Sequence, residues 1–239
     1  MAYQAIFKRY EIKYLLTQHQ KQTVLAAMKP YMALDRYGRT TIRNIYFDTE
    51  NYRLIRRSIE KPAYKEKLRI RSYQKANSES PVFVELKKKY NSIVYKRRLA
   101  MPEKDAMAWI CRVTPRESDS QIAAEINYVL DYYETLRPTV FLSYEREAYY
   151  ALDGSDFRIT FDDHILSRQD NLSLESEVGG TPLLPEGNIL MEIKTSGGIP
   201  LWMTHVLTQE RIFKTSFSKY GTAYQTTIFP EQKGSTTTI

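Results

Sequence analysis

Apolar and polar residues alternate along eight stretches of the chain, and this period of two is typical of half-buried β-strands. The stretches are rich in Ile, Val, Tyr, Phe and Arg, and they cover residues 5–15, 41–48, 65–73, 82–89, 92–99, 140–149, 157–162 and 189–195. Short turns join several of them, and helical segments are inserted at a few places. The pattern predicts an α+β fold, built as an antiparallel sheet or as a closed barrel.

Helix signals occupy four segments between these strands. Thr17 is a candidate N-cap for a helix that runs through residue 32, and Pro102 opens a second helix with acidic residues after it. Residues 117–136 and residues 201–213 repeat their apolar positions at helical spacing. The sequence therefore predicts about eight strands and four helices.

The size and composition of the chain limit its class. Its 239 residues are 42% hydrophobic, and no long Pro, Gly or Ser linker divides them, so we expect one domain over residues 1–228 and a flexible tail over residues 229–239. The single Cys111 excludes an intramolecular disulfide and a Cys-based zinc site. No stretch approaches 18 apolar residues, and the N-terminus lacks a continuous apolar signal segment. We expect a cytoplasmic protein without membrane insertion.

Cations gather on one face of most predicted strands. In residues 65–73, Lys67, Arg69 and Arg71 share one face, and Leu68 and Ile70 point to the other. The same alternation places charged groups together on five further strands: Arg9, Glu11 and Lys13; Glu85, Lys87 and Lys89; Arg146; Arg158 and Asp162; Glu192 and Lys194. With 35 Lys and Arg against 28 Asp and Glu, the net charge of +7 suggests an anionic partner.

A charged strand face has an ordinary explanation, since one side of an antiparallel sheet is commonly solvated. Here the charged faces are dominated by cations, and they recur on six strands across the whole chain. A sheet closed on itself would turn these faces inward and line a basic tunnel. Such a tunnel needs an anion to offset the repulsion, and Arg forks suit phosphate oxygens.

Four acids share the cationic faces: Glu11, Glu85, Asp162 and Glu192. Two interpretations stay open for each. The carboxylate pairs with neighbouring Lys and Arg, or it holds a hard divalent metal ion that bridges phosphates.

An ordered set of motifs resembles the VTC-type polyphosphate polymerase domain, a branch of the triphosphate tunnel metalloenzymes in the CYTH-like superfamily. The matching pieces are RYEIKY (9–14), IYFDT (45–49), KLRIRSY (67–73), FVELKKK (83–89), SYEREAY (143–149), RITFDD (158–163), LMEIK (190–194) and FSKYG (217–221). They run from near residue 5 to near residue 225 in the order of the family. The resemblance implies a closed eight-stranded antiparallel β-barrel flanked by helices, whose lumen binds triphosphate or polyphosphate.

The resemblance also implies roles for residues at the motif positions. Lys13, Lys87, Arg158 and Glu192 would be catalytic. Glu192, and with it Glu11 and Glu85, would hold Mn²⁺ or Mg²⁺. Phosphates or nucleotide would be bound by Arg9, Arg69, Arg71, Lys89, Arg146, Lys194, Ser218 and Lys219.

The reaction implied by the family is transfer of the γ-phosphoryl group of ATP onto a growing inorganic polyphosphate chain. Fungal relatives carry a phosphate-sensing domain and membrane helices that this sequence does not show, so coupling to translocation would need a separate membrane partner. Lys89 stands where relatives can have a His, and the nearest Lys before Ser218 is Lys214. These departures would alter rate or chain-length preference.

Three alternatives compete with this function. A tripolyphosphatase or nucleoside triphosphatase would use the same barrel, and a noncatalytic module would bind polyphosphate without turnover. Nucleic-acid binding is disfavoured, because the cations alternate with core residues instead of forming an exposed stripe. The chain has no GxxxxGK[ST] and no GxGxxG after a strand, and its three His have no metal-ligand spacing.

Overall fold

A computed structural model describes residues 10–91, 93–115 and 120–230. Its strands are β1 (Tyr10–Leu16), β2 (Met32–Asp48), β3 (Tyr64–Ser72), β4 (Pro81–Tyr90), β5 (Ile93–Pro102), β6 (Arg137–Ala151), β7 (Arg158–Arg168), β8 (Thr181–Pro182), β9 (Ile189–Thr195) and β10 (Lys214–Thr215). All of them belong to one antiparallel sheet, ordered β10-β1-β9-β7-β6-β2-β3-β4-β5, with β8 paired to β7. The predicted α+β class is confirmed.

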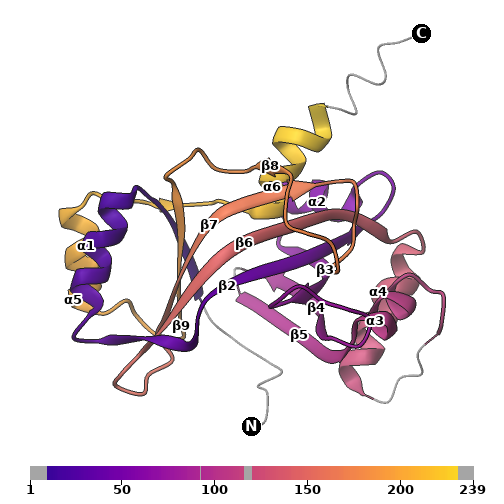
Figure 1. Cartoon of the computed structure of the whole chain (residues 1–239), viewed down its shortest axis with the longest axis horizontal. Helices are drawn as coiled ribbons and strands as arrows, with labels where there is room; N and C mark the ends of the chain where they lie inside the picture. Colours follow the sequence, from indigo (N-terminus) through magenta and orange to yellow (C-terminus); the bar gives the residue numbers. More distant parts are fainter. Residues whose placement is uncertain (1–9, 92, 116–119, 231–239) are drawn as a thin grey trace.

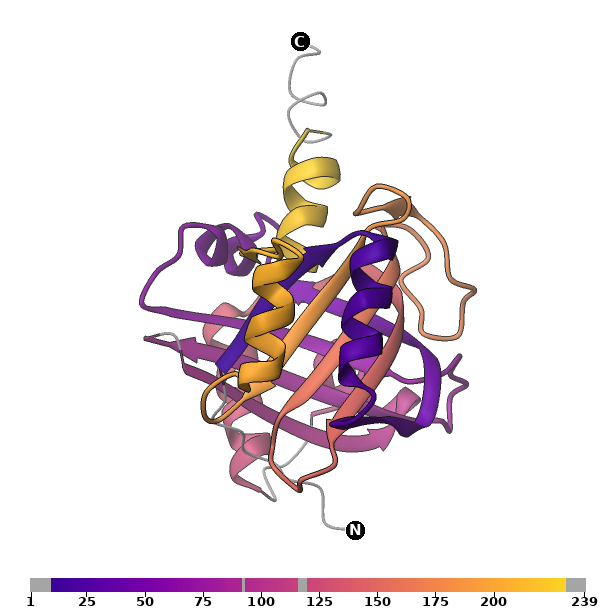
Figure 2. The same cartoon turned by 90° about the vertical axis from the view of Figure 1, so that its left-hand side faces the viewer.

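Helices flank this sheet in separate groups (Figures 1 and 2). They are α1 (Gln18–Met28), α2 (Arg53–Ile59), α3 (Glu103–Ile110), α4 (Gln121–Tyr133), α5 (Leu201–Gln209) and α6 (Lys219–Ala223), which continues into the π-helical turn η1 (Tyr224–Ile228). Figure 2 shows α1 and α5 side by side across one part of the sheet, and Figure 1 shows α3 and α4 at the opposite end of the molecule.

Apolar strand faces pack under these helices and leave the charged faces on the inside. One buried cluster joins Leu68, Ile70, Val84 and Leu86 to α3 and α4. A second cluster joins the outer faces of β1, β7 and β9 to α1 and α5. A third surrounds α6 and η1 and fills part of the inner space next to β2, β6 and β9. The two-residue alternation expected from the sequence therefore separates core from charge.

Helix α2 was not expected from the sequence, and its anchor explains why. It has no side-chain cap from its own N-cap residue, Tyr52. Instead the buried carboxylate of Asp48 accepts hydrogen bonds from the backbone N–H groups of Leu54 and Ile55, at 2.9 and 3.0 Å. The phenol of Tyr220 on α6 donates to the same carboxylate at 2.9 Å. Asp48 thus ties the end of β2 to two helices far apart in sequence.

Other boundaries differ from the expectations. The first helix ends at Met28 instead of residue 32, because Met32 already pairs with Ala151 in the long strand β2. Helix α5 ends at Gln209, and Lys214 and Thr215 form a short strand beside β1. Of the predicted tail, residues 231–239 lie outside the described residues, and Phe229 keeps helical backbone angles.

The closure of the predicted eight-stranded barrel is not confirmed. Among the described residues, no backbone pairing joins β5 to β1, and the sheet has ten strands. Part of the free edge of β1 is taken by β10, which pairs with Lys13 and Tyr14. The seam is nevertheless narrow, since Cα atoms of β1 and β5 come within 8 Å and Lys87 on β4 reaches Glu11 on β1 at 3.1 Å. The sheet is rolled, and side chains bridge its seam.

No helix in the described part of the chain is long and apolar enough to cross a membrane.

Candidate active site: a basic channel

The rolled sheet encloses a channel of about 2420 Å³. Sixteen Lys and Arg residues line it, against four acidic residues. Ordinary small-molecule pockets measure about 300–1000 Å³, so this space suits a longer ligand. Its charge indicates that the ligand is a polyanion.

Rows of cations form where the inner faces of β3, β4 and β5 meet. Lys67 pairs in register with Lys87, and Lys87 pairs with Lys96, so that three lysines stand side by side across the strands. The next row toward one end pairs Lys65 with Lys89. Like charges directly opposite each other destabilise a sheet, and Glu11 beside Lys87 and Glu85 beside Lys96 offset only part of this repulsion.

Electrostatics within the lysine row agree with a site that is prepared for anions. Burial, reinforced by the charges of Lys13 and Lys87, lowers the pKa of Lys67 to about 7. Burial also lowers the pKa of Lys96 to about 7, although Glu85 opposes this shift. The ammonium of Lys67 donates to the hydroxyl of Ser218 at 3.0 Å. A bound polyanion would restore full protonation to these lysines.

Glu11 and Glu192 lie on neighbouring strands and share Lys13. The ammonium of Lys13 is 3.4 Å from the Glu11 carboxylate and 3.5 Å from that of Glu192. Lys194 lies 2.9 Å from Glu192. Burial would raise the pKa of Glu192, but the surrounding cations, Lys194 first, hold it well below its usual range. Both carboxylates are therefore ionised at neutral pH.

Arg146 and Lys219 converge on a deeper acid, Asp162. The guanidinium of Arg146 binds Asp162 with two hydrogen bonds of 2.5 and 2.6 Å and reaches Glu192 at 3.4 Å. The ammonium of Lys219 lies between the same two acids, hydrogen-bonded to Asp162 and 3.4 Å from Glu192. Arg146 and Lys219, two of the residues predicted to bind phosphate, are thus held in place by ion pairs with protein carboxylates.

Glu85 occupies a similar position below Arg69 and Arg71. Its buried carboxylate lies 2.7 Å from Arg69, 3.8 Å from Arg71 and 2.5 Å from Lys96. Tyr46 accepts a further hydrogen bond from Arg69 at 2.8 Å. Burial would raise the pKa of Glu85, but Arg71, Arg69 and Lys96 hold it well below its usual range. This geometry matches the ion-pairing interpretation of Glu85.

The residues of the channel fit a divalent metal only in part. In the described ranges, no three His, Cys, Asp or Glu side chains converge into a group that could hold a metal ion. Glu11 and Glu192 line the channel and supply the hard oxygen donors that Mg²⁺ and Mn²⁺ prefer. Mg²⁺ is commonly held by one or two carboxylates plus substrate phosphates. The pair therefore suits an ion that arrives with its phosphate ligand.

The remaining predicted residues are placed as follows. Arg158 and Lys89 line the channel, and within the described residues neither is seen in a hydrogen bond or ion pair. Ser218 also lines it and caps α6 by accepting from the backbone N–H of Gly221 at 3.2 Å. Arg9 lies outside the described residues.

Several channel residues received no site role from the sequence. Lys67 was aligned with Arg69 but not assigned, and Lys65, Lys96 and Arg98 were not considered for the site. The signal for Lys96 and Arg98 was available, because residues 93–100 alternate in the same way as β4 and follow it through a short turn. A hairpin brings those alternate positions beside Lys87 and Glu85.

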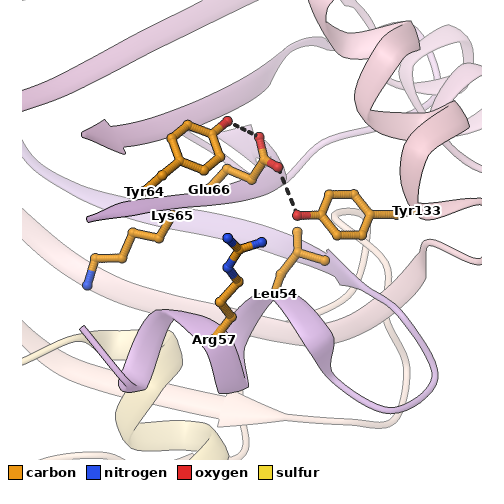
Figure 3. Close-up of a pocket in the computed structure, with 6 residues that line it drawn as sticks. All are labelled: Leu54, Arg57, Tyr64, Lys65, Glu66 and Tyr133. Carbon is orange, nitrogen blue, oxygen red and sulfur yellow. Dashed lines mark hydrogen bonds between the residues drawn. The ribbon is translucent and has the colours of Figure 1, made fainter. Parts of the chain in front are cut away.

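A small hollow behind β3 is a structural anchor (Figure 3). Figure 3 shows Glu66 between Tyr64 and Tyr133, and its carboxylate accepts from the two phenols at 2.6 and 2.8 Å. Leu54 and Arg57 of α2 close the other side of this hollow. Both carboxylate oxygens of Glu66 are occupied, so the hollow fixes β3 against α4 and offers no free acid to a substrate.

Comparison with known proteins places this geometry in a family. The model of the VTC domain matches residues 8–228. A candidate adenylate cyclase from Bacillus halodurans is similar in structure, with a TM-score of 0.57 and 12% identity over 90% of this chain and 96% of the other. A candidate adenylyl cyclase from Hippeastrum, described as having a dominant triphosphatase activity, gives a TM-score of 0.51 and 15% identity over 92% and 95% of the two chains. No curated protein sequence matches the chain.

Proposed function

The chain belongs to the VTC domain family, and from this membership and the charge of the channel we propose that it is a metal-dependent phosphotransferase. It moves the γ-phosphoryl group of ATP onto a growing inorganic polyphosphate chain. The observation that carries the proposal is the enclosed channel, with sixteen cationic and four acidic lining residues. Its lysine row is only partly neutralised, by Glu11 at Lys87 and by Glu85 at Lys96, and a polyanion would offset the remaining repulsion.

Two groups of cations divide the binding of the phosphates. Arg69, Arg71 and Arg146 are oriented by Glu85, Asn44 and Asp162, so their remaining N–H groups are preorganised for the nucleotide phosphates. Lys13, Lys87 and Arg158 neutralise charge that develops on the transferred group. Phosphoryl transfer asks the protein mainly for such positioning and charge stabilisation.

Glu192 and Glu11 are the residues that would hold Mn²⁺ or Mg²⁺. Such an ion would supply Lewis-acid charge neutralisation to the phosphates. The cations around Glu192 keep it ionised, as a metal ligand must be.

The acceptor needs no strong general base. A terminal oxygen of the polyphosphate chain is already anionic, and it attacks the γ-phosphorus as the bond to the β-phosphate oxygen breaks and ADP leaves. A hydrolase instead has to position and deprotonate a water molecule. Within the described residues, no His lines the channel, and Glu11, Glu192 and Asp162 are all engaged with cations.

A triphosphatase is the second candidate, because the Hippeastrum protein of similar fold is described with that activity. The size of the channel favours the polymerase, since about 2420 Å³ leaves room for an acceptor beside a nucleotide triphosphate. A noncatalytic module would bind both ligands without turnover.

The test is incubation of the purified chain with ATP and Mn²⁺ or Mg²⁺, followed by gel analysis of phosphate chains and an assay of ADP. Long chains with equal amounts of transferred phosphate and ADP support the polymerase. Free phosphate without chains supports the triphosphatase, and unchanged ATP at saturating binding supports the binding module. Cyclic AMP would point to a cyclase on the same fold.

A further inference from the structure

Four partly exposed tyrosines gather at one end of the channel. Tyr10 begins β1, Tyr150 is the penultimate residue of β6, Tyr73 follows β3, and Tyr37 lies in the first part of β2. Because neighbouring strands are antiparallel, β1 and β2 begin on the same side of the sheet on which β3 and β6 end. All four line the channel, and their exposed fractions are 57%, 43%, 41% and 63%.

The opposite end of the channel has different chemistry. It is lined by Lys61 and Lys65, before and at the start of β3, and by Lys89 near the end of β4. The tyrosine end instead carries the arginines Arg36 and Arg158. Lysine supplies point charge to phosphates, whereas tyrosine and arginine also offer flat surfaces to an aromatic ligand. The channel is therefore chemically asymmetric along its length.

A bulge in β2 holds Tyr37 in place at this end. The pairing of β2 with β6 shifts between Leu34 and Arg39, and Gly38 takes a φ of +60°. The carboxylate of Asp35 accepts from the backbone N–H of Tyr37 at 2.9 Å. The guanidinium of Arg36 lies over the Tyr37 ring, 4.8 Å from its centre, and donates to its hydroxyl at 2.6 Å. Bulges next to active sites re-aim side chains, and this one presents a fixed ring.

Tyr150 stands in register with the outermost phosphate-binding groups. It pairs with Arg158, which pairs with Lys194, which pairs with Glu11. The next inward row contains Lys13 and Glu192, two residues further along each strand, at a spacing of about 7 Å. A triphosphate bound between these rows and Arg146 leaves the nucleoside at the strand ends, beside Tyr150.

Exposed tyrosines at strand ends often do no more than pack against neighbouring side chains. Here four of them border a channel whose interior is built for phosphates, and a nucleotide is the ligand with a polyanionic end and a flat aromatic end. We propose that Tyr37 and Tyr150, which lie near each other where β2 pairs with the end of β6, form a base-stacking subsite for a purine nucleotide. This inference rests on the proposed use of ATP and assigns the end of the channel at which ATP enters.

The experiment compares two ligands in equilibrium binding without turnover. ATP and inorganic tripolyphosphate are titrated by calorimetry into wild type, the double variant Tyr37→Ala/Tyr150→Ala, and the control Tyr90→Ala. Tyr90 is 52% exposed and ends β4 at the lysine end. In the double variant ATP affinity falls about tenfold, the scale of losing one stacked base, while tripolyphosphate affinity stays within about twofold. As a second measurement, the fluorescence of 2-aminopurine riboside triphosphate is quenched when it binds to wild type, and it is quenched less when it binds to the double variant.

The subsite is overturned if the double variant loses affinity equally for ATP and tripolyphosphate, or loses none. It is also overturned if Tyr90→Ala loses as much ATP affinity as the double variant. Retained tripolyphosphate binding shows that the double variant is folded. A wild type that binds tripolyphosphate but not ATP also overturns the subsite, while the phosphate chemistry of the channel stands. A selective loss of ATP affinity in a chain that makes no polyphosphate supports the subsite and rejects the polymerase.

Discussion

Replacing Lys67 by Met should stabilise the free protein and weaken its binding to polyphosphate. Lys67 stands in register with Lys87, and Lys87 with Lys96. In the described part of the chain Glu11 pairs with Lys87 and Glu85 with Lys96, whereas Lys67 has no ion pair. Methionine keeps the length and apolar stem of the side chain and removes only its charge. A residue that is merely structural would change stability and binding in the same direction.

The size of the effect follows from the pKa of Lys67. Burial and the neighbouring cations lower it from 10.5 to about 7. At about 1.36 kcal/mol per pH unit this corresponds to roughly 5 kcal/mol against the charged form. Lys67 keeps part of its solvent exposure, which screens the charge, so we expect the variant to gain about 1–3 kcal/mol in the free energy of unfolding at pH 7.

The stability gained by Lys67→Met should decrease as the pH rises. The unfolded chain holds the Lys67 proton up to about pH 10.5, whereas the folded chain releases it near pH 7. Between these values the unfolded state binds more protons, so raising the pH favours the folded wild type. The advantage of Lys67→Met is therefore largest at or below pH 7 and shrinks toward pH 10.

Urea unfolding at several pH values measures the stability, and calorimetry with tripolyphosphate measures the binding. Loss of one charge-assisted contact should cost about 1.5–3 kcal/mol of affinity. Lys88→Met is the matched control, because Lys88 lies on the outer face of β4 and pairs with Glu125 at 3.0 Å. It should lose a little stability and keep its affinity. A less stable Lys67→Met variant, or one with unchanged affinity, would refute the reasoning.

Three further predictions concern the acids and arginines. Glu192→Gln should abolish metal-dependent turnover and lower the free energy of unfolding by about 3–5 kcal/mol, since Lys13, Lys194, Arg146 and Lys219 lose a shared partner. Near-normal activity with unchanged metal dependence would reject that role. Arg69→Ala and Arg71→Ala should each weaken tripolyphosphate binding by about 1.5–3 kcal/mol, measured by calorimetry, and unaltered affinity would count against their place in the site. Asp48→Ala should cost about 2–4 kcal/mol in urea unfolding through its lost bonds to Leu54, Ile55 and Tyr220, and a neutral effect would contradict the anchor.

Strand faces were the most predictable part of the site. Alternation in residues 65–73 separated Lys67, Arg69 and Arg71 from Leu68 and Ile70, and the structure puts the first set in the channel and the second in the core. Helix α2 was missed because its N-terminal N–H groups bond to Asp48 and Thr49, several residues before the helix, and not to its N-cap residue Tyr52. Such a partner is set by the path of the chain and leaves no periodic signal.

Which residues share a strand face follows from residue order alone, because side-chain direction in a strand alternates with position. Cations outnumber acids on those faces, which favours an anionic ligand. Only the tertiary structure decided which charges meet. The rolling of the sheet places Glu11 beside Lys87, and the pairing of β6 with β7 joins Arg146 to Asp162. It leaves Lys67, Lys87 and Lys96 in one row and gathers the tyrosines at one end. Pairing across strands depends on register and on the curvature of the sheet, which local sequence does not encode.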